Sequence, residues 1–248
     1  ETEKLPRSKT VVLFHDTFMN YNYPQVGKAA VEVLEAAGFD IILSQKKCCG
    51  RPMISKGMIR QAIENAQYNI DCLLPYVEQG IPIIGCEPSC ISALTDDYVD
   101  LIPGDESKLV AENTFMIEEF MLNCHEKDEL DLNFTENPKE ILLHGHCHQR
   151  ALVGIQPSFK VLDLPSGYNV EVIDSSCCGM AGSFGYEAEH YDLSMKIGEL
   201  RLFDQIRSKT GDFEVAVSGV SCREQIKHGT GKEPLHLIEL IRDAIRQA

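Results

Sequence analysis

Short runs of β-branched and aliphatic residues alternate along this chain with longer stretches of helical periodicity. The runs typical of buried strands are TVVLF, FDIILS and IPIIG in the first half, and EILLHG, NVEVID and FEVAVSG in the second. Helical spacing of apolar residues predicts helices over 26–38, over 55–79 with an interruption at Pro75, over 190–209 and over 233–248, and mostly helix over 87–133. Residues 15–27 and 146–154 are expected to be loops. Strands that alternate with helices indicate an α/β fold with parallel sheets.

A cysteine motif repeats in register with these strands. The tripeptide Cys-Cys-Gly occurs at 48–50 and again at 177–179, and a single cysteine follows the third strand of each half. The matching pairs are Thr17 and Cys147, Cys49 and Cys178, and Cys90 and Cys222, at offsets of 130, 129 and 132 residues. The nearly constant offset predicts two similar Rossmann-like parallel-sheet units, 1–135 and 136–248, related by a pseudo-twofold axis.

Charge and length narrow the class of protein. The 248 residues carry 38 acidic and 23 basic side chains, a net charge of −15, which argues against a nucleic-acid surface. No apolar run approaches the roughly 20 residues that cross a bilayer, so we expect a soluble, cytoplasmic protein. Because the first residue is Glu1, we also expect a processed product or a piece of a longer polypeptide.

Four cysteines of the second half form the main candidate site. Cys147, Cys177, Cys178 and Cys222 each follow a predicted strand, and the carboxyl ends of parallel strands meet at one edge of a sheet. Adjacent cysteines suit a single zinc ion poorly but can bind different atoms of an iron–sulfur cluster, which is therefore favoured. The alternatives are buried small side chains, as we expect for the lone Cys72 and Cys124, or a strained disulfide between 177 and 178.

The first half has an incomplete cysteine set. Cys48, Cys49 and Cys90 match the second half, but Thr17 stands where Cys147 would be. The candidates to complete a second metal site are His15, Asp16 and the off-register Cys86. Two further alternatives are a degenerate, empty site and a zinc site.

Several residues beside the cysteines are candidates for supporting roles. His146 and His148 flank Cys147 and could donate hydrogen bonds or protons to a cluster, or ligate it; each is equally well explained as a solvated loop histidine. His190 is a weaker candidate. The spacing of Gly179, Gly182 and Gly185 differs from that of a dinucleotide-binding loop, so these glycines indicate close backbone approach and N–H donation to the cluster.

The motifs CCGRPM, CEPSC, HGHCHQ, DSSCCGMAGSFGYE and VSCREQI resemble the cysteine-rich CCG domain, over nearly the whole chain and in two copies. That domain occurs in heterodisulfide reductase and in iron–sulfur subunits of glycolate oxidase, lactate-utilisation and anaerobic glycerol-3-phosphate dehydrogenase systems. The similarity is greatest to the C-terminal region of FAD-linked oxidoreductases of the D-lactate dehydrogenase type. The fullest CCG pattern ends in C-x-x-C, whereas Gly219 and Glu87 stand at the first of those positions here, which argues for a four-cysteine cluster and against a five-cysteine noncubane one.

The resemblance implies a [4Fe-4S] cluster on Cys147, Cys177, Cys178 and Cys222. The cluster would pass electrons between a flavin, where a 2-hydroxy acid is oxidised, and a downstream acceptor. The chain has no ferredoxin motif and no recognisable flavin-binding stretch, so FAD is expected in a partner domain or subunit, together with a ferredoxin-like cluster domain. Membrane contact would then be peripheral, through partners. The competing functions are a zinc-stabilised or metal-free assembly module and a thiol–disulfide reductase.

Overall fold

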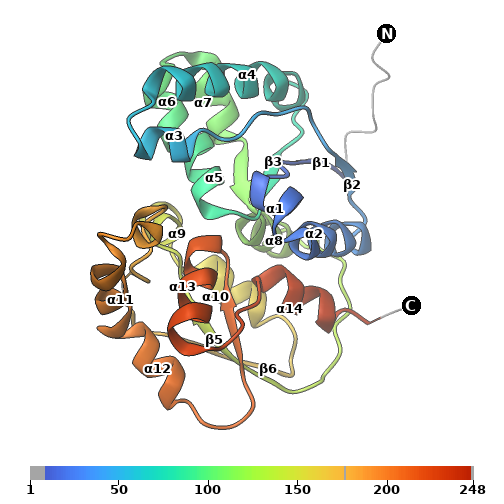
Figure 1. Cartoon of the computed structure of the whole chain (residues 1–248). Coiled ribbons are helices and arrows are strands. Elements are labelled where there is room, and N and C mark those ends of the chain that lie inside the picture. Colours follow the sequence, from blue (N-terminus) through green and yellow to red (C-terminus); the bar gives the residue numbers. More distant parts are fainter. Residues whose placement is uncertain (1–8, 176, 247–248) are drawn as a thin grey trace. The chain divides into compact units, whose positions relative to one another are not determined.

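The computed structural model describes residues 9–175 and 177–246, which form two compact units that divide between Leu132 and Asn133 (Figure 1). Each unit contains one parallel β-sheet with helices around it. The predicted α/β fold with two parallel-sheet units is confirmed. The predicted pseudo-twofold axis stays a prediction.

The first sheet consists of β1 (Thr10–Leu13), β2 (Asp40–Ile42), β3 (Ile83–Gly85) and β4 (Thr114–Met116), in the order β2-β1-β3-β4. All neighbours are parallel, with Val12 opposite Ile83 in the central pair. The central strand β1 is buried along its whole length, which explains its continuous apolar sequence. The strand β4 was not predicted, because its three residues lie inside an amphipathic stretch that we expected to be helical.

The helices of this unit are α1 (Thr17–Tyr21), α2 (Pro24–Ala36), α3 (Arg51–Ser55), α4 (Ile59–Val77), α5 (Pro88–Ser92), α6 (Tyr98–Leu101), α7 (Asp105–Glu112) and α8 (Ile117–Glu126), with a π-helical turn at Ala93–Asp97. Helices α4, α6 and α7 pack together on one side of the sheet (Figure 1). The expected loop over 15–27 is wrong, because the Asp16 carboxylate accepts the Met19 N–H and caps α1. Pro75 does not interrupt α4, which begins at Ile59 instead of residue 55.

The second sheet consists of β5 (Lys139–His144), β6 (Tyr168–Val172) and β7 (Glu214–Val217), in the order β6-β5-β7 and all parallel. Its helices are α9 (Cys147–Leu152), α10 (Gln156–Leu162), α11 (Tyr191–Glu199), α12 (Leu202–Ser208), α13 (Val220–Thr230) and α14 (Leu237–Ala244), with a 3-10 turn at Phe184–Tyr186. The expected loop over 146–154 is wrong, because α9 fills most of it. The expected helix over 190–209 is divided into α11 and α12.

The two units repeat one topology. In each, the first strand lies between the second and the third. Thr17 and Cys147 are the first residues of the helices that follow the first strands, and Cys90 and Cys222 are the third residues of the helices that follow the third strands. The residues that match in sequence therefore occupy equivalent places in their own units.

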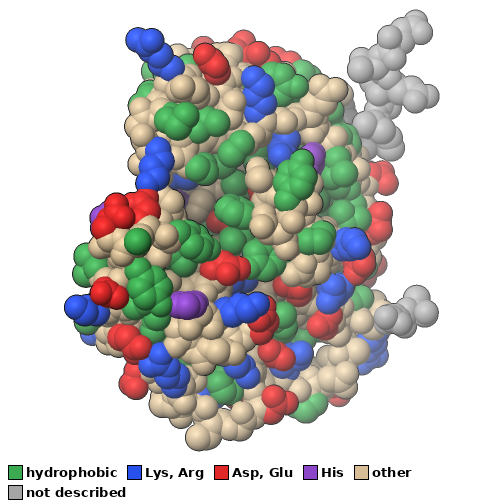
Figure 2. Space-filling view, in the orientation of Figure 1, with side chains coloured by type: hydrophobic (Ala, Val, Ile, Leu, Met, Phe, Trp, Pro, Cys, Tyr) green, Lys and Arg blue, Asp and Glu red, His purple; other side chains and the backbone are tan. Residues whose placement is uncertain are grey.

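No helix within the part of the chain that the structure describes is long and apolar enough to cross a bilayer. On the face seen in Figure 2, lysine and arginine side chains are interspersed with aspartate and glutamate. The basic side chains in that view are scattered over the surface, whereas a phosphate-binding surface needs them clustered.

Candidate metal centre at the carboxyl ends of the strands

Three cysteines of the second unit meet beyond the carboxyl ends of β6 and β7. Cys178 and Cys222 are 3% and 2% exposed, and the Cys178 thiol is hydrogen-bonded to the thiols of both Cys222 and Cys177. The Cys177 sulfur also accepts the backbone N–H of Gly179 at 3.3 Å. The structure thus brings together three of the four predicted ligands, with Cys178 in contact with the other two.

Crowding of these thiols opposes their ionisation. The hydrogen bond to Cys178, followed by burial, raises the pKa of Cys177 far above its usual value. Although the bond from Cys177 lowers it, the bond to Cys222 and burial together raise the pKa of Cys178 well above the usual value. A bound cation would reverse this preference, because metal ions deprotonate coordinating thiols. The soft, buried donor set fits a thiophilic metal or an iron–sulfur cluster.

The fourth predicted ligand, Cys147, is exposed and begins α9. Within residues 9–175 and 177–246, no three His, Cys, Asp or Glu side chains are grouped closely enough to hold one metal ion. The four-cysteine ligand set therefore stays a prediction. Its geometric support is the matching position in the first unit, where the Thr17 hydroxyl is hydrogen-bonded to the Cys48 thiol.

His146 is 2% exposed and is the N-cap of α9. Its Nδ1 accepts the backbone N–H of His148 at 3.2 Å, so the neutral ring carries its proton on Nε2, which lies 3.4 Å from the Ser221 hydroxyl. A Cβ added to Gly219 would collide with this ring. The solvated-loop explanation therefore fails for His146, which packs against the turn between β7 and α13. His148 is half-buried, with its ring edge-on to His146 at 5.3 Å.

Gly179 adopts a φ of +95°, and a Cβ there would collide with the carbonyl oxygen of Ser194. The Ser194 hydroxyl donates to the Gly179 carbonyl at 2.9 Å, and the Gln225 amide donates to the Ser194 hydroxyl at 2.9 Å. The loop after the cysteine pair is thus fastened to α11 and α13. A side chain at Gly185 would also collide with Ser194, whereas Gly182 faces open space. Close backbone approach therefore explains two of the three glycines.

The first unit contains the corresponding cysteine group. The thiols of Cys49 and Cys90 lie 3.1 Å apart, and Cys48 is hydrogen-bonded to Cys49. The Tyr98 hydroxyl donates to the Cys49 carbonyl at 3.0 Å and accepts from the Asn69 amide at 2.8 Å. This buried chain fixes the cysteine loop, and no sequence signal indicated it.

The candidates to complete the first site differ in their surroundings. Burial, with a contribution from Glu87, raises the pKa of Asp16 to about 6. His15 lies 3.1 Å from the Ser44 carbonyl through Nε2, and Cys86 is buried. Their coordination roles stay predictions.

Two other residues singled out in the sequence, His190 and Cys124, are explained by their neighbours in the fold. His190 lies 3.0 Å from the Glu187 carboxylate and stacks on Phe184 at 4.2 Å. Cys124 is buried, and burial raises its pKa to about 11. Both arrangements are typical of local packing.

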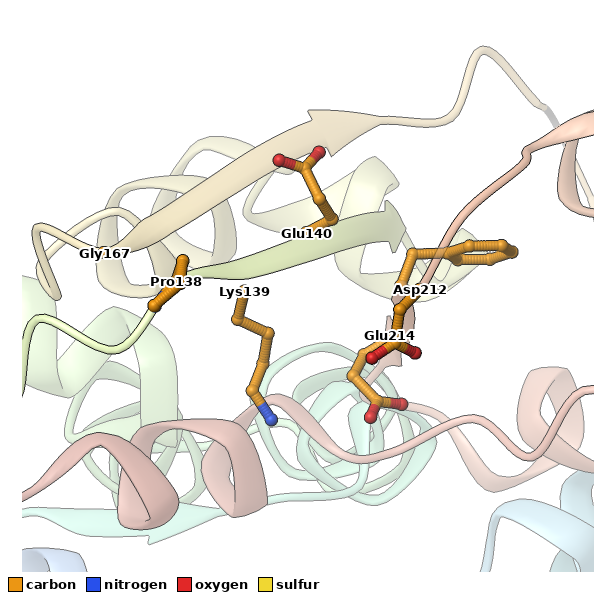
Figure 3. Close-up of a pocket in the computed structure, with 7 residues that line it drawn as sticks. Pro138, Lys139, Glu140, Gly167, Asp212 and Glu214 are labelled. Carbon is orange, nitrogen blue, oxygen red and sulfur yellow. The ribbon is translucent and has the colours of Figure 1, made fainter.

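A pocket of about 260 Å³ lies at the opposite, amino ends of β5 and β7 (Figure 3). Its lining residues are Pro138, Lys139, Glu140, Gly167, Asp212, Phe213 and Glu214. In Figure 3 the Lys139 and Glu214 side chains extend to one side of the sheet and Glu140 to the other. The pocket is separated from the cysteines by the length of the strands.

Three known proteins are similar in sequence to this chain over nearly its whole length. The chain is 32% identical over 237 residues to a subunit of the anaerobic glycerol-3-phosphate dehydrogenase of Escherichia coli strain K12, covering 95% of this chain and 59% of that protein. It is 26% identical over 241 residues to D-2-hydroxyglutarate dehydrogenase of the same strain, covering 97% and 23%, and 25% identical over 255 residues to lactate utilization protein A of an Exiguobacterium species, covering 96% and 99%.

The chain thus spans about six-tenths of the first relative and about a quarter of the second. Residues 12–95, which include Cys48, Cys49 and Cys90, match the cysteine-rich CCG domain. The predicted resemblance to that domain is confirmed for residues 12–95.

Proposed function

We propose that this chain is an iron–sulfur electron-transfer domain or subunit of a flavin-dependent dehydrogenase. The observation that carries the proposal is the group of Cys177, Cys178 and Cys222, with two thiols nearly inaccessible to solvent at the carboxyl edge of a parallel sheet. The names of the relatives support it, since two are dehydrogenases or subunits of one and the third serves lactate utilization. The relatives favour a 2-hydroxy acid or a phosphorylated alcohol as the substrate class.

In this proposal Cys147, Cys177, Cys178 and Cys222 bind a [4Fe-4S] cluster, which supplies one-electron redox chemistry when bound. The protein binds and shields it: Gly179 donates its N–H to the Cys177 sulfur, and His146 offers an Nε2–H donor at the start of α9. Hydrogen bonds to cluster sulfurs are one of the means by which a protein sets a reduction potential. Oxidation of the substrate takes place on FAD in a partner domain or subunit, in the cytoplasm.

The first-unit site has a different proposed occupant. Cys48, Cys49 and Cys90 supply three thiols, and the Thr17 hydroxyl takes the place of the fourth. Three thiolates and one further donor are a common zinc ligand set. The second candidate function, a zinc-stabilised assembly module, rests on this site, and Cys86, Asp16 and His15 are its nearest candidates for the fourth ligand.

A thiol–disulfide reductase is disfavoured. Such enzymes need a thiol with a depressed pKa, whereas the pKa values of Cys48, Cys49 and Cys177 are all raised. Hydrogen bonds among the thiols and burial raise these pKa values. The one exception is the hydrogen bond from Cys48, which by itself lowers the pKa of Cys49.

Anaerobic reconstitution with iron and sulfide tests the proposal. We expect roughly four iron and four sulfide per chain, and a loss of most of both in Cys178→Ser. Cys124→Ser is the matched control, because Cys124 is equally buried but lies outside both groups. Full cluster content in Cys178→Ser would refute the ligand assignment, and a colourless wild-type protein with stoichiometric zinc would favour the assembly module.

A further inference from the structure

His144 is the last residue of β5 and is 1% exposed. Its Nδ1 lies 2.8 Å from the hydroxyl of Ser175, which is itself 3% exposed and precedes the Cys177–Cys178 pair by two residues. Its Nε2 is buried and has no hydrogen-bond partner among the described residues. A buried polar atom without a partner costs free energy, so the ring requires a specific explanation.

The ring is uncharged at neutral pH. Burial, followed by the nearby His146 and Arg150, lowers the pKa of His144 to about 3. A neutral imidazole has one N–H, on either Nδ1 or Nε2. In the first case Nε2 is an acceptor without a donor, and in the second case the Nε2–H is a donor without an acceptor. An apolar ring of similar size would avoid this cost. The polar group that the imidazole contributes is therefore Nδ1, and its partner is Ser175.

Ser175 lies in a segment that leaves β6 and leads to the cysteine pair. Its carbonyl accepts from Arg150 Nη1, and the preceding Ile173 N–H donates to the Leu143 carbonyl at 2.9 Å. The His144 bond joins the side chain of the same serine to the central strand. The end of β5 thus holds this segment through both backbone and side chain.

The first unit contains a comparable connection between a histidine and a serine. His15 follows β1, as His144 ends β5, and its Nε2 lies 3.1 Å from the carbonyl of Ser44, which follows β2. The two contacts are not identical: at the offset of 130 that relates Thr17 to Cys147, His15 lies one position beyond the match of His144, and it meets a carbonyl instead of a hydroxyl. A histidine at the end of the first strand therefore meets a serine beyond the second strand in both units.

We propose that His144 is a positioning residue, which holds Ser175 and thereby fixes the loop that presents Cys177 and Cys178. The importance of this loop for a cluster rests on the proposed function. The positioning itself is a property of the metal-free chain.

Alkylation of the metal-free, reduced chain tests the positioning directly. His144→Phe keeps the ring but loses the bond, Ser175→Ala removes its partner, and His144→Asn restores an amide group where Nδ1 was. Iodoacetamide labelling, read by mass spectrometry, reports how often the loop opens to expose Cys178. We expect about tenfold faster labelling of Cys178 in His144→Phe and Ser175→Ala, and a rate within about threefold of wild type in His144→Asn.

The control is His15→Asn, which alters the histidine beyond the first strand of the other unit and should leave labelling of Cys178 unchanged. Ser175→Ala removes a single oxygen atom, so it decides the question if His144→Phe does not fold. Equal labelling of Cys178 in Ser175→Ala, His144→Phe and wild type would overturn the inference.

Reconstituted protein provides a second readout. If the loop positions cluster ligands, Ser175→Ala and His144→Phe should shift the midpoint potential or the electron paramagnetic resonance spectrum, whereas His144→Asn should leave both close to those of wild type. A wild-type chain that takes up no iron and sulfide would refute the proposed function, while the labelling rates would still decide the role of His144.

Discussion

The imidazole of His146 fills the space that a side chain on Gly219 would need. Position 219 is where the fullest CCG pattern has the first cysteine of its closing C-x-x-C. In this chain a ring from the turn between β5 and α9 takes the place of that side chain. A cysteine at position 219 would therefore require the His146 ring to move.

A double-mutant cycle tests this relationship. Gly219→Ala should lower the free energy of unfolding by about 1–3 kcal/mol, because the added methyl group must displace the His146 ring. In a His146→Ala background the same substitution should cost less than about 0.5 kcal/mol, since the ring is gone. Urea unfolding followed by circular dichroism gives all four values. Equal costs in the two backgrounds would mean that the ring does not occupy this space.

Gly179→Ala should be more damaging than Gly50→Ala. Both glycines have positive φ angles, +95° and +85°, so alanine is strained at each by about 1–2 kcal/mol. Only at 179 does the new Cβ meet a backbone carbonyl, that of Ser194, whereas at 50 the nearest atom, in Ala62, is 3.5 Å away. We expect a further loss of about 1–3 kcal/mol for Gly179→Ala, or failure to fold. Similar unfolding midpoints for the two variants would contradict the predicted clash.

The raised pKa of Asp16 predicts that the free energy of unfolding depends on pH. Its pKa is raised from 3.8 to about 6 in the folded chain, mainly by burial. A raised folded-state pKa contributes stability below pH 4, and that contribution is lost as the pH rises through 6. Above pH 7 the ionised carboxylate therefore costs on the order of 3 kcal/mol.

Asp16→Asn removes this charge and retains a good N-cap for α1. We expect it to raise the free energy of unfolding by up to about 3 kcal/mol at pH 8 and by only about 1 kcal/mol at pH 4.5. Asp212→Asn, at an exposed position, is the control. A gain of equal size at both pH values would show that the carboxylate charge is not the cause.

Thr17 and Cys147 allow a reciprocal test of the ligand set. Cys147→Thr should reduce the cluster content of reconstituted protein to that of Cys178→Ser, because the second unit then has the three-cysteine set of the first. Thr17→Cys should add a fourth thiol beside Cys48 and increase bound metal, measured as iron or zinc per chain. Thr17→Ser keeps the hydroxyl and should bind the same amount of metal per chain as wild type. Full iron content in Cys147→Thr would remove Cys147 from the site.

The sequence predicted the strands better than the short helices. Runs such as TVVLF and EILLHG are buried in central strands, and their composition alone indicates this. Helices α1 and α9 were missed because each depends on one capping side chain, Asp16 or His146. A cap stabilises a short helix without altering the periodicity on which prediction relies.

The cysteine groups were predictable in part. The constant offset between the halves correctly matched Cys49 with Cys178 and Cys90 with Cys222 in equivalent places. The supporting pairs, such as Asn69 with Tyr98 and Ser194 with Gln225, join residues about 30 positions apart. Such contacts are set by how helices pack, and no local pattern of polarity marks them.

Helix α13 carries both Cys222 and Gln225, and Gln225 holds the Gly179 loop through Ser194. A movement of α13 would therefore carry the cysteine pair along with Cys222. The polypeptide therefore couples the position of the cysteine pair to that of Cys222 before any metal arrives. Because these side chains already join the loop to α11 and α13, the free energy of binding a metal need not include the ordering of an unfolded loop.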